Sequence, residues 1–287
     1  MNEMTSLSFL RQVAGTAYNG GRLVGANLAD ISRELLLLRP ALRRPIFVVG
    51  SGHSGTTLMR VLIGELPNVH GIEVESGLFR SPPGDTRTRA KSALQRRPYR
   101  QATLWDKEAK NNHSKRWCEK TPWHVLRIDM ALRLFPRAKV IIMVRDGRDV
   151  VNSMMKRGRA LDESCDLWRR AIDAGRPYHH NERCHVVHYE DLISDPEGTL
   201  RRVCGFIGET FDHRILSFHE RTQTHNRQRG VVVGAQEEHL EVRNAQINQP
   251  LFDGRGRWLD DLTESQRGSL EIAIGDLLEE LNYGDAT

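Results

Sequence analysis

The sequence lacks the features of several common protein classes. No apolar run approaches the roughly eighteen residues that a bilayer requires, so we expect no transmembrane span. The first residues show no basic region followed by an apolar core and a small-residue cleavage site, so we expect no secretory signal. The four cysteines are widely spaced and form no Cys-x-x-Cys or Cys/His ligand pattern. We therefore expect reduced, structural thiols in a cytoplasmic protein.

Aromatic residues are also scarce, at 6% of the chain. Nucleic-acid binding would need a continuous basic face with stacking aromatics, so we expect no nucleic-acid partner. The net charge is +5, from 42 basic and 37 acidic residues, which suits an anionic cofactor or acceptor. With 287 residues, of which 39% are hydrophobic, the chain can bury a sizeable core.

Short apolar runs alternate with helical patterns from Pro45 onward. Strands are predicted at 46–49, 69–74, near 117–119, 139–144 and 184–188, each followed by residues with helical spacing. This alternation predicts an α/β fold of three layers, with a central parallel sheet joined by right-handed crossovers. Residues 76–101 are predicted as a basic loop, and residues 222–258 as a lid or binding loop.

Two regions are expected from this pattern: an N-terminal helical extension at residues 1–44 and one domain at residues 45–287. The extension could pack on the domain, lie on a membrane surface or make a contact between copies of the chain. Packing is the simplest of the three. A homo-oligomer therefore stays open, and the sequence does not decide it.

The most informative stretch is a glycine-rich turn, Gly50–Thr57, between the first strand and its helix. Glycines let the backbone approach a ligand closely, and the N–H groups and dipole of the helix start favour an anion. A nucleotide-triphosphatase loop ends Gly-Lys-Ser/Thr, but here Thr56 stands where the lysine would be. A ligand with a single phosphate at this place is therefore favoured over Mg-ATP. The alternative is an ordinary strand–helix turn with small residues.

Two motifs together resemble those of one enzyme family. Ser54–Thr57 after a strand resembles the sulfotransferase loop that binds the 5′-phosphosulfate end of PAPS (3′-phosphoadenosine 5′-phosphosulfate). The segment 140–153 resembles that family's 3′-phosphate motif, in which a strand ends in arginine, here Arg145, and a serine, here Ser153, follows eight residues later. The motifs stand in family order, about ninety residues apart, within a resemblance that runs from about Pro45 to Trp258. The most similar branch is the tyrosylprotein-sulfotransferase-like and bacterial one.

The resemblance implies a P-loop-like sulfotransferase fold and a set of residues that bind PAPS. Arg145 and Ser153 would hold the 3′-phosphate, and Arg255 or Arg257, in a late basic segment, could add a second contact to it. The alternative for Arg145 is a salt bridge at the strand end with Asp146 or Asp149. The residues implied for the 5′-phosphate end are Ser51, Gly52, His53, Ser54, Gly55, Thr56 and Thr57.

For catalysis, the branch places a glutamate shortly after the first helix as the base that takes the proton of the acceptor hydroxyl. Glu75 lies one residue after the position expected from the family, and Glu73 one residue before it. We favour Glu75 and keep Glu73 open. Lys120 resembles the family's second catalytic cation. His53 departs from the family, which usually has arginine or lysine at that place. It could donate a hydrogen bond to the bridging oxygen, act as acid or base, or serve as a spacer.

The resulting hypothesis is a metal-independent transferase that moves a sulfuryl group from PAPS to a hydroxyl of a small molecule, a carbohydrate, a phenol or a tyrosine. One alternative is a nucleotide kinase or other phosphoryl-transfer enzyme, which the missing loop lysine disfavours. The other is a non-catalytic nucleotide-binding protein on the same scaffold, which His53 supports. The sequence does not identify the acceptor.

Overall fold

The computed structural model describes residues 44–79, 88–220 and 248–284, with side chains described throughout these ranges except at 88–97. Contacts along the chain divide it into one unit of residues 1–38 and another of residues 39–287. The first unit lies outside the described residues, and so does nearly all of the predicted extension at 1–44. Most of the binding loop predicted at 222–258 also lies outside them.

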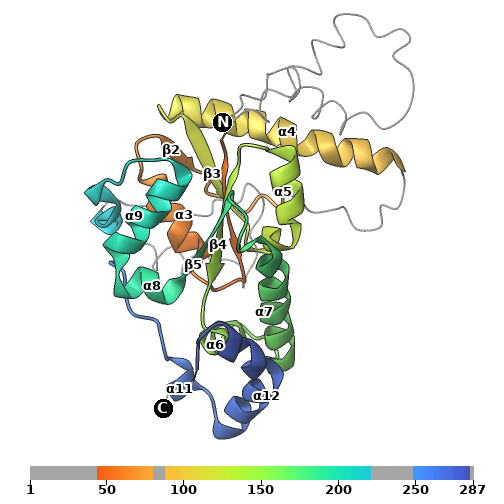
Figure 1. Ribbon diagram of the computed structural model, residues 1–287, viewed down its shortest axis with the longest axis vertical. Coiled ribbons are helices and arrows are strands. Elements are labelled where there is room, and N and C mark those ends of the chain that lie inside the picture. Colours follow the sequence, from red (N-terminus) through yellow and green to blue (C-terminus); the bar gives the residue numbers. More distant parts are fainter. Residues whose placement is uncertain (1–43, 80–87, 221–247, 285–287) are drawn as a thin grey trace, which may run out of the picture. The chain divides into compact units, whose positions relative to one another are not determined.

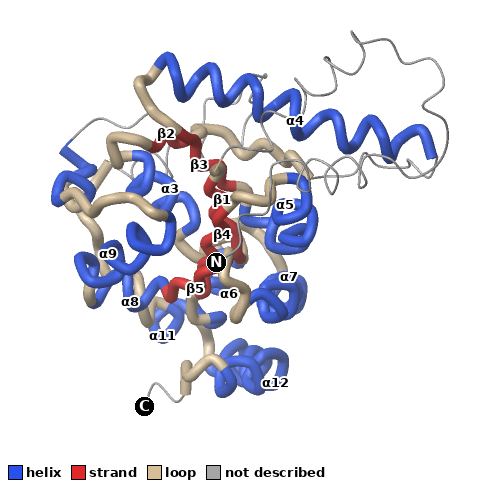
Figure 2. The backbone as a smooth tube through the Cα atoms, turned by 45° about the horizontal axis from the view of Figure 1, so that its top comes forward, coloured by secondary structure: helices blue, strands red, loops and turns tan. Residues whose placement is uncertain are grey.

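A parallel sheet forms the centre of the described residues, and its five strands follow the order β2-β3-β1-β4-β5 (Figures 1 and 2). In register, Val48 on the central strand pairs with Lys120 on one neighbour and Ile141 on the other. The predicted parallel sheet is confirmed. The strands are β1 (Ile46–Gly50), β2 (Val69–Gly71), β3 (Arg116–Lys120), β4 (Lys139–Val144) and β5 (Cys184–His188).

Successive strand residues point to opposite faces of the sheet, and each face has its own core. Phe47 and Val49 belong to the core on the first face, and Ile46 and Val48 to the core on the second. Helices therefore cover both faces, which confirms the three-layer α/β class. On the first face lie α4 (Thr88–Asn111), the 3₁₀ helix η2 (Pro122–Arg127), α5 (Ile128–Leu134), α6 (Gly147–Met155), α7 (Leu161–Gly175), α11 (Trp258–Asp261) and α12 (Glu264–Glu280). On the second lie α3 (Thr56–Gly64), α8 (Tyr189–Ser194), α9 (Pro196–Ile207) and the 3₁₀ helices η4 (His213–Ile215) and η5 (Phe218–Glu220).

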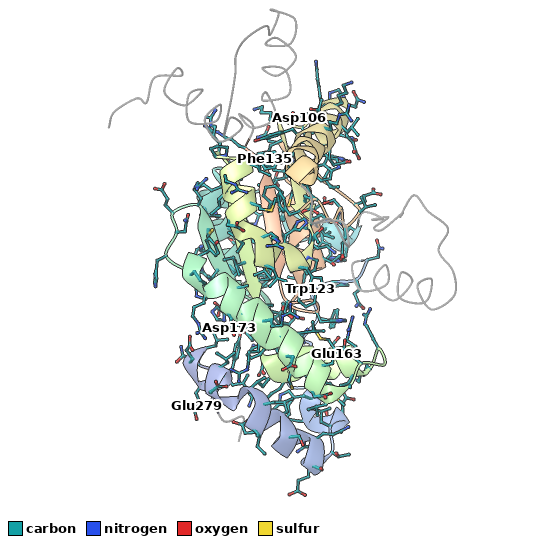
Figure 3. All side chains as sticks on the ribbon, turned by 90° about the vertical axis from the view of Figure 1, so that its right-hand side faces the viewer. Asp106, Trp123, Phe135, Glu163, Asp173 and Glu279 are labelled. Atoms are coloured by element: carbon teal, nitrogen blue, oxygen red, sulfur yellow. The ribbon has the colours of Figure 1, made fainter. Side chains whose placement is uncertain are left out.

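Helix α4 corrects one expectation. Residues 76–101 were predicted as a loop because their basic residues hide the apolar pattern, but Thr88–Asn111 is helical. Ala102, Trp105 and Ala109 follow one another at helical spacing and are buried, and the Trp105 ring packs against Trp117 of β3 with centroids 4.8 Å apart. Tertiary packing thus secures this helix. Figure 3 looks onto the side that carries α7, with Glu163 and Asp173 labelled on that helix and Asp106 on α4.

Two neighbouring strands send their following helices to opposite faces. The chain passes from β1 into α3 on the second face, and from β4 into α6 on the first. Such a divergence opens a crevice beyond the carboxyl ends of the strands, where parallel sheets bind ligands. The loop after Gly50 and the turn after Val144 therefore meet at one place. Among the described residues, every helix is too short or too polar to cross a membrane.

Candidate active site

The loop between β1 and α3 has the geometry of an anion cradle. Gly50 has a φ of 144°, and a Cβ there would lie 2.3 Å from the carbonyl oxygen of Met143. Gly55 has a φ of 83° and ends the loop as the N-cap of α3, without a side-chain cap bond. Only glycine fits both places without strain. Among the described residues, the buried hydroxyls of Ser51 and Ser54 have no hydrogen-bond partner. An anion held in this loop would supply acceptors to both hydroxyls and to the first N–H groups of the helix.

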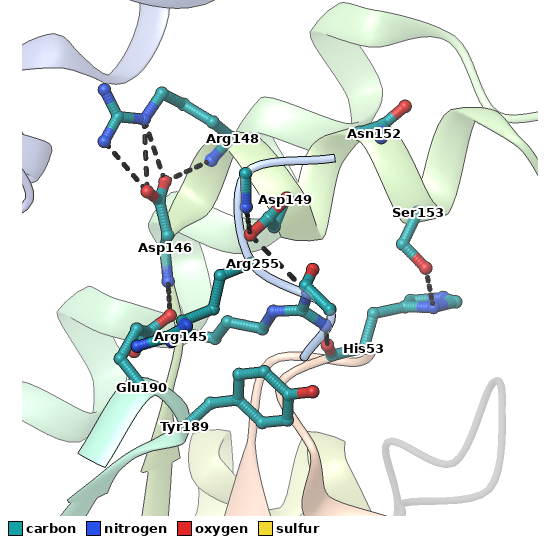
Figure 4. A network of polar contacts seen from close by, with 12 residues as sticks. His53, Arg145, Asp146, Arg148, Asp149, Asn152, Ser153, Tyr189, Glu190 and Arg255 are labelled. Carbon is teal, nitrogen blue, oxygen red and sulfur yellow. Dashed lines mark hydrogen bonds and ion pairs between the residues drawn. The ribbon is translucent and has the colours of Figure 1, made fainter. Parts of the chain in front are cut away.

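Arg145 follows β4 directly and reaches across to this loop (Figure 4). Its Nη1 donates to the carbonyl oxygen of His53 at 3.2 Å, and its Nη2 donates to that of Gly254 at 2.6 Å. The guanidinium lies over the Tyr189 ring, 4.3 Å from its centroid. Its Nη2 is also 3.6 Å from Asp149 Oδ2, so the predicted alternative of a strand-end salt bridge is present in part. Arg145 joins three segments that are distant in sequence.

Both motifs border one cavity of about 490 Å³. The lining combines charged and polar groups, such as Arg145 and Thr56, with apolar and aromatic ones, such as Leu251 and Tyr189. Such a mixture suits a ligand with an anionic portion and a flat apolar portion. Nine of the predicted residues line this cavity: Gly52, His53, Gly55, Thr56, Thr57, Glu75, Arg145, Ser153 and Arg257. Other lining residues include Leu58, Pro122, Asp149, Asn152, Lys156, Arg157, Tyr189, Phe218, Leu251 and Phe252.

The structure separates the two candidate bases. Glu75 lines the cavity, and its Oε1 lies 2.5 Å from Nζ of Lys120. The Lys120 side chain is 3% exposed and that of Glu75 is 30% exposed. This places a carboxylate at the cavity wall and its ammonium partner behind it. Glu73 is exposed and lies outside the cavity lining, although its charge acts on the buried Arg60.

His53 and Ser153 contact each other. His53 adopts a left-handed backbone conformation with a φ of 67°, and its Nδ1 lies 2.9 Å from Ser153 Oγ on α6. Figure 4 shows this contact. Both residues line the cavity. Ser153, which the resemblance implies for the 3′-phosphate, therefore also orients the imidazole that stands in place of a basic residue.

The two late arginines differ in position. Arg257 lines the cavity and lies over the Phe252 ring, 5.3 Å from its centroid. Arg255 lies outside the lining and forms an ion pair with Asp253 at 2.7 Å, and its hydrogen bonds lower the pKa of Asp253 to about 2. Arg257 is thus the better placed of the two for a ligand in this cavity.

Sequence reasoning assigned no binding role to two residues at this site. Tyr189 directly follows β5, so the strand-end position that drew attention to Arg145 also marks Tyr189. Asp149 lies one helical turn after Arg145 and accepts a hydrogen bond from the Gly256 N–H at 3.0 Å. Burial raises its pKa, although the nearby Arg145 opposes the shift. Asp149 thereby connects α6 to the segment that carries Arg257.

The sequence and the fold were compared with known proteins. A model described as "Sulfotransferase family" matches residues 45–213, more than half of the chain. A protein named protein-tyrosine sulfotransferase 2 from Gallus gallus is 28% identical over 205 residues, which cover 61% of this chain and 54% of that one. An omega-hydroxy-beta-dihydromenaquinone-9 sulfotransferase from Mycobacterium tuberculosis is 36% identical over 108 residues, which cover 31% of this chain and 28% of that one.

Solved structures resemble the fold as well. A mouse sulfotransferase complexed with PAP superposes with a TM-score of 0.52 at 16% identity, over 86% of this chain and 90% of that one. At this identity the likeness concerns the fold alone. The chain spans about half the length of the Gallus gallus relative, since the match covers 54% of that protein.

Proposed function

The chain belongs to the sulfotransferase family, and on that premise we propose that it transfers the sulfuryl group of PAPS to an acceptor hydroxyl. One observation carries this proposal: the glycine loop, Arg145 and Glu75 line a single cavity, and Lys120 contacts Glu75 from behind the cavity wall. A cradle for the nucleotide, a base and a cation are the parts that this transfer requires.

The residues present fit PAPS. The partnerless hydroxyls of Ser51 and Ser54, among the described residues, and the start of α3 suit its 5′ end. Arg145, whose Nε is buried without a partner among the described residues, suits a phosphate at the other end. The rings of Tyr189 and Phe252 line the same cavity, each with a guanidinium over one face, and supply apolar surface for the adenine.

Bound there, PAPS supplies a sulfuryl group whose bond to the 5′-phosphate oxygen breaks as a bond to the acceptor oxygen forms. Glu75 takes the proton of the acceptor hydroxyl, because it is the one of the two candidate carboxylates that lines the cavity. His53, in the loop, supplies a hydrogen bond or positive charge where the leaving oxygen gains negative charge, and Lys120 adds positive charge from behind the cavity wall through its pair with Glu75. The base and the cations all come from the chain itself.

The acceptor is proposed only as a class. Relatives are named for a protein tyrosine and for an omega-hydroxy menaquinone, so their acceptors are a phenol and an alcohol. The same hydroxyl chemistry extends to small molecules and carbohydrates. We also propose a cytoplasmic location, which the four buried, unpaired cysteines support, because such thiols persist in reducing compartments.

The test is transfer of ³⁵S from labelled PAPS, with EDTA present, to 4-nitrophenol, a tyrosine peptide with acidic neighbours, 1-dodecanol and N-acetylglucosamine. Labelled product identified by mass spectrometry supports the proposal. Tight binding of adenosine 3′,5′-bisphosphate (PAP) without transfer to any acceptor, including a cell extract, favours the non-catalytic alternative. Hydrolysis of ATP that depends on Mg²⁺ favours a kinase.

A further inference from the structure

The segment that carries Glu75 leaves the sheet before it reaches the cavity. β2 ends at Gly71, and the last backbone bond between this segment and β3 runs from Ile72 N to Cys118 O at 2.8 Å. Past Ile72, the backbone bonds within the described residues no longer tie the segment to the sheet. Side chains must therefore fix the position of Glu75.

Two consecutive residues of β3 hold two consecutive residues of this segment. Lys120 Nζ contacts Glu75 Oε1 at 2.5 Å, and Glu119 Oε1 accepts the hydroxyl of Ser76 at 2.7 Å and its N–H at 3.3 Å. Because successive side chains of a strand point to opposite faces, Lys120 and Glu119 hold the segment from both faces of the sheet. The segment that carries Glu75 thus contacts the end of β3 on both faces of the sheet.

Glu119 is a fully buried carboxylate whose oxygens are well supplied with donors. It also accepts the Thr121 hydroxyl at 2.5 Å, and its Oε2 lies 3.2 Å from His124 Nδ1. Burial alone would raise the pKa of Glu119, but the interaction with His124 and the hydrogen bonds outweigh it and lower the pKa. A carboxylate is costly to bury, and an apolar side chain would serve the core as well. What an apolar side chain could not provide is an acceptor for the hydrogen bonds that Glu119 receives.

The same cluster binds the three residues that follow Ser76. The N–H of Gly77 donates to Thr121 Oγ1 at 3.4 Å, that of Leu78 to Ser76 Oγ at 3.1 Å, and that of Phe79 to His124 Nε2 at 3.4 Å. The Phe79 ring also packs on His124, with centroids 4.6 Å apart. Ser76 is therefore tied to β3, Gly77 to Thr121 directly after β3 and Phe79 to η2, while Leu78 is tied to Ser76.

We propose that Ser76 and Glu119 are positioning residues that hold Glu75 against Lys120 and at the cavity wall. This inference rests on the proposed function, because it assigns Glu75 the role of base. Neither residue touches the cavity, so both act through Glu75. Removing the Ser76 hydroxyl takes away its 2.7 Å bond to Glu119 and the acceptor of the Leu78 N–H, and so loosens the segment next to Glu75.

The experiment measures kcat and the Kd of PAP for S76A, S76T and S114A, with whichever probe of the acceptor panel the wild type uses fastest. For S76A we expect kcat to fall about 10- to 100-fold, because small misplacements of a reacting group cost this much, with the Kd of PAP unchanged. S76T keeps the hydroxyl and should restore most of the rate. S114A is the matched control, since Ser114 lies just before the start of β3 and its hydroxyl donates to the carbonyl of Asn112 at 3.4 Å.

A double-mutant cycle separates positioning from a general loss of structure. If Ser76 acts through Glu75, S76A lowers the residual rate of E75Q little or not at all. An undiminished effect of S76A in the E75Q background, or a wild-type rate for S76A, overturns the inference. E119Q offers an independent variant: an amide cannot accept all these donors, so we expect the same fall in kcat with PAP binding retained.

Hydrogen exchange of the backbone amides of residues 72–79 can be measured without knowing the acceptor of the sulfuryl group. Faster exchange in S76A than in S114A supports the inference, and equal exchange contradicts it whether or not an acceptor has been found. If the wild type itself neither transfers sulfate nor binds PAP, the proposed function fails instead. The two failures are therefore distinguishable.

Discussion

Lys120 combines deep burial with a close carboxylate at the cavity wall. Its side chain is 3% exposed and its ammonium lies 2.5 Å from Glu75. We expect K120A to lower kcat about 100- to 1,000-fold, the usual effect of removing one group that stabilises developing charge. The Kd of PAP, measured by calorimetry, should stay within about threefold of the wild type, because Lys120 lies outside the cavity lining.

The exposed Lys110 at the end of α4 provides the matched control, and K110A should behave as wild type. Equal losses of kcat and of PAP affinity in K120A would mean that Lys120 binds the nucleotide and does not act in the transfer.

For Arg145 we predict the opposite effect, a loss of PAP affinity. Its fork already donates to two backbone carbonyls, and a 3′-phosphate would replace these weaker acceptors with a charged one. We expect R145A to weaken PAP binding by about 2–4 kcal/mol, as for the loss of one partner of a charged pair. Binding of adenosine 5′-phosphate, which lacks the 3′-phosphate, should weaken much less.

Comparing the Kd values of PAP and of adenosine 5′-phosphate therefore isolates the contact between Arg145 and the 3′-phosphate. R201A, at an exposed arginine paired with Glu197, is the control. If R145A weakens both nucleotides equally, Arg145 supports the loop through His53 and Gly254 and does not select the 3′-phosphate.

At this scale the sequence predicted which residue types meet but not which of two neighbours faces the site. Glu73 and Glu75 are two residues apart and would share one face if the strand continued. It ends at Gly71, and side-chain contacts to β3 decide that Glu75 borders the cavity. Asp149 went unassigned because its partner, the Gly256 N–H, belongs to a segment 107 residues later.

The loop–helix element gives a prediction about backbone geometry. A Cβ on Gly55 would lie 2.8 Å from the Tyr189 ring, and its φ of 83° is strained for any other residue. We expect G55A to weaken PAP binding at least tenfold, because both the loop and the aromatic wall must shift. G205A is the control, since a Cβ there meets nothing within 4 Å. PAP affinity in G55A equal to that in G205A would show that the loop adapts and is not a rigid cradle.

Elements were predicted well where apolar residues are continuous and poorly where charge interrupts them. β1 and β4 are buried strands, and their apolar runs mark them in the sequence, whereas β5 is half-buried and is marked by Val186 and Val187. β2 is shorter than predicted, at Val69–Gly71, because the chain turns toward the β3 end after Ile72. Helix α4 was missed because, among its described side chains, the core-facing stripe through Ala102 and Trp105 is interrupted by polar residues.

At the scale of the whole described structure, residues near the C-terminal end are tied to the sheet edge that carries the site. The Tyr283 hydroxyl donates to Glu190 Oε2 at 2.8 Å and lies 2.9 Å from His188 Nδ1. Glu190 in turn accepts the N–H of Asp146, next to Arg145, at 3.0 Å. Arg148 donates to the Tyr283 carbonyl at 2.9 Å. These contacts join the residues after α12 to β5, to α8 and to the turn after β4. The stability of the domain and the shape of the site therefore depend on the same hydrogen bonds.

We expect Y283F to lower the unfolding free energy by about 1–3 kcal/mol at pH 7, because it leaves the Glu190 oxygen without its donor. Burial, followed by the Glu190 charge, raises the pKa of Tyr283 well above its usual value of 10.0. Its folded pKa exceeds its unfolded pKa, so the stability that it contributes is complete below pH 10 and falls as the unfolded chain loses the proton above it.

The stability difference between wild type and Y283F should therefore shrink above pH 10, by up to about 1.4 kcal/mol per pH unit. Urea unfolding at pH 7, 9, 10 and 10.5 measures it. A difference that stays constant across this range would show that the Tyr283 hydroxyl is not held by Glu190. No difference at pH 7 would mean that the C-terminal contacts do not stabilise the domain. Because subtracting the two proteins cancels the titrating groups that do not contact Tyr283, the change between pH 9 and pH 10.5 reports this hydroxyl.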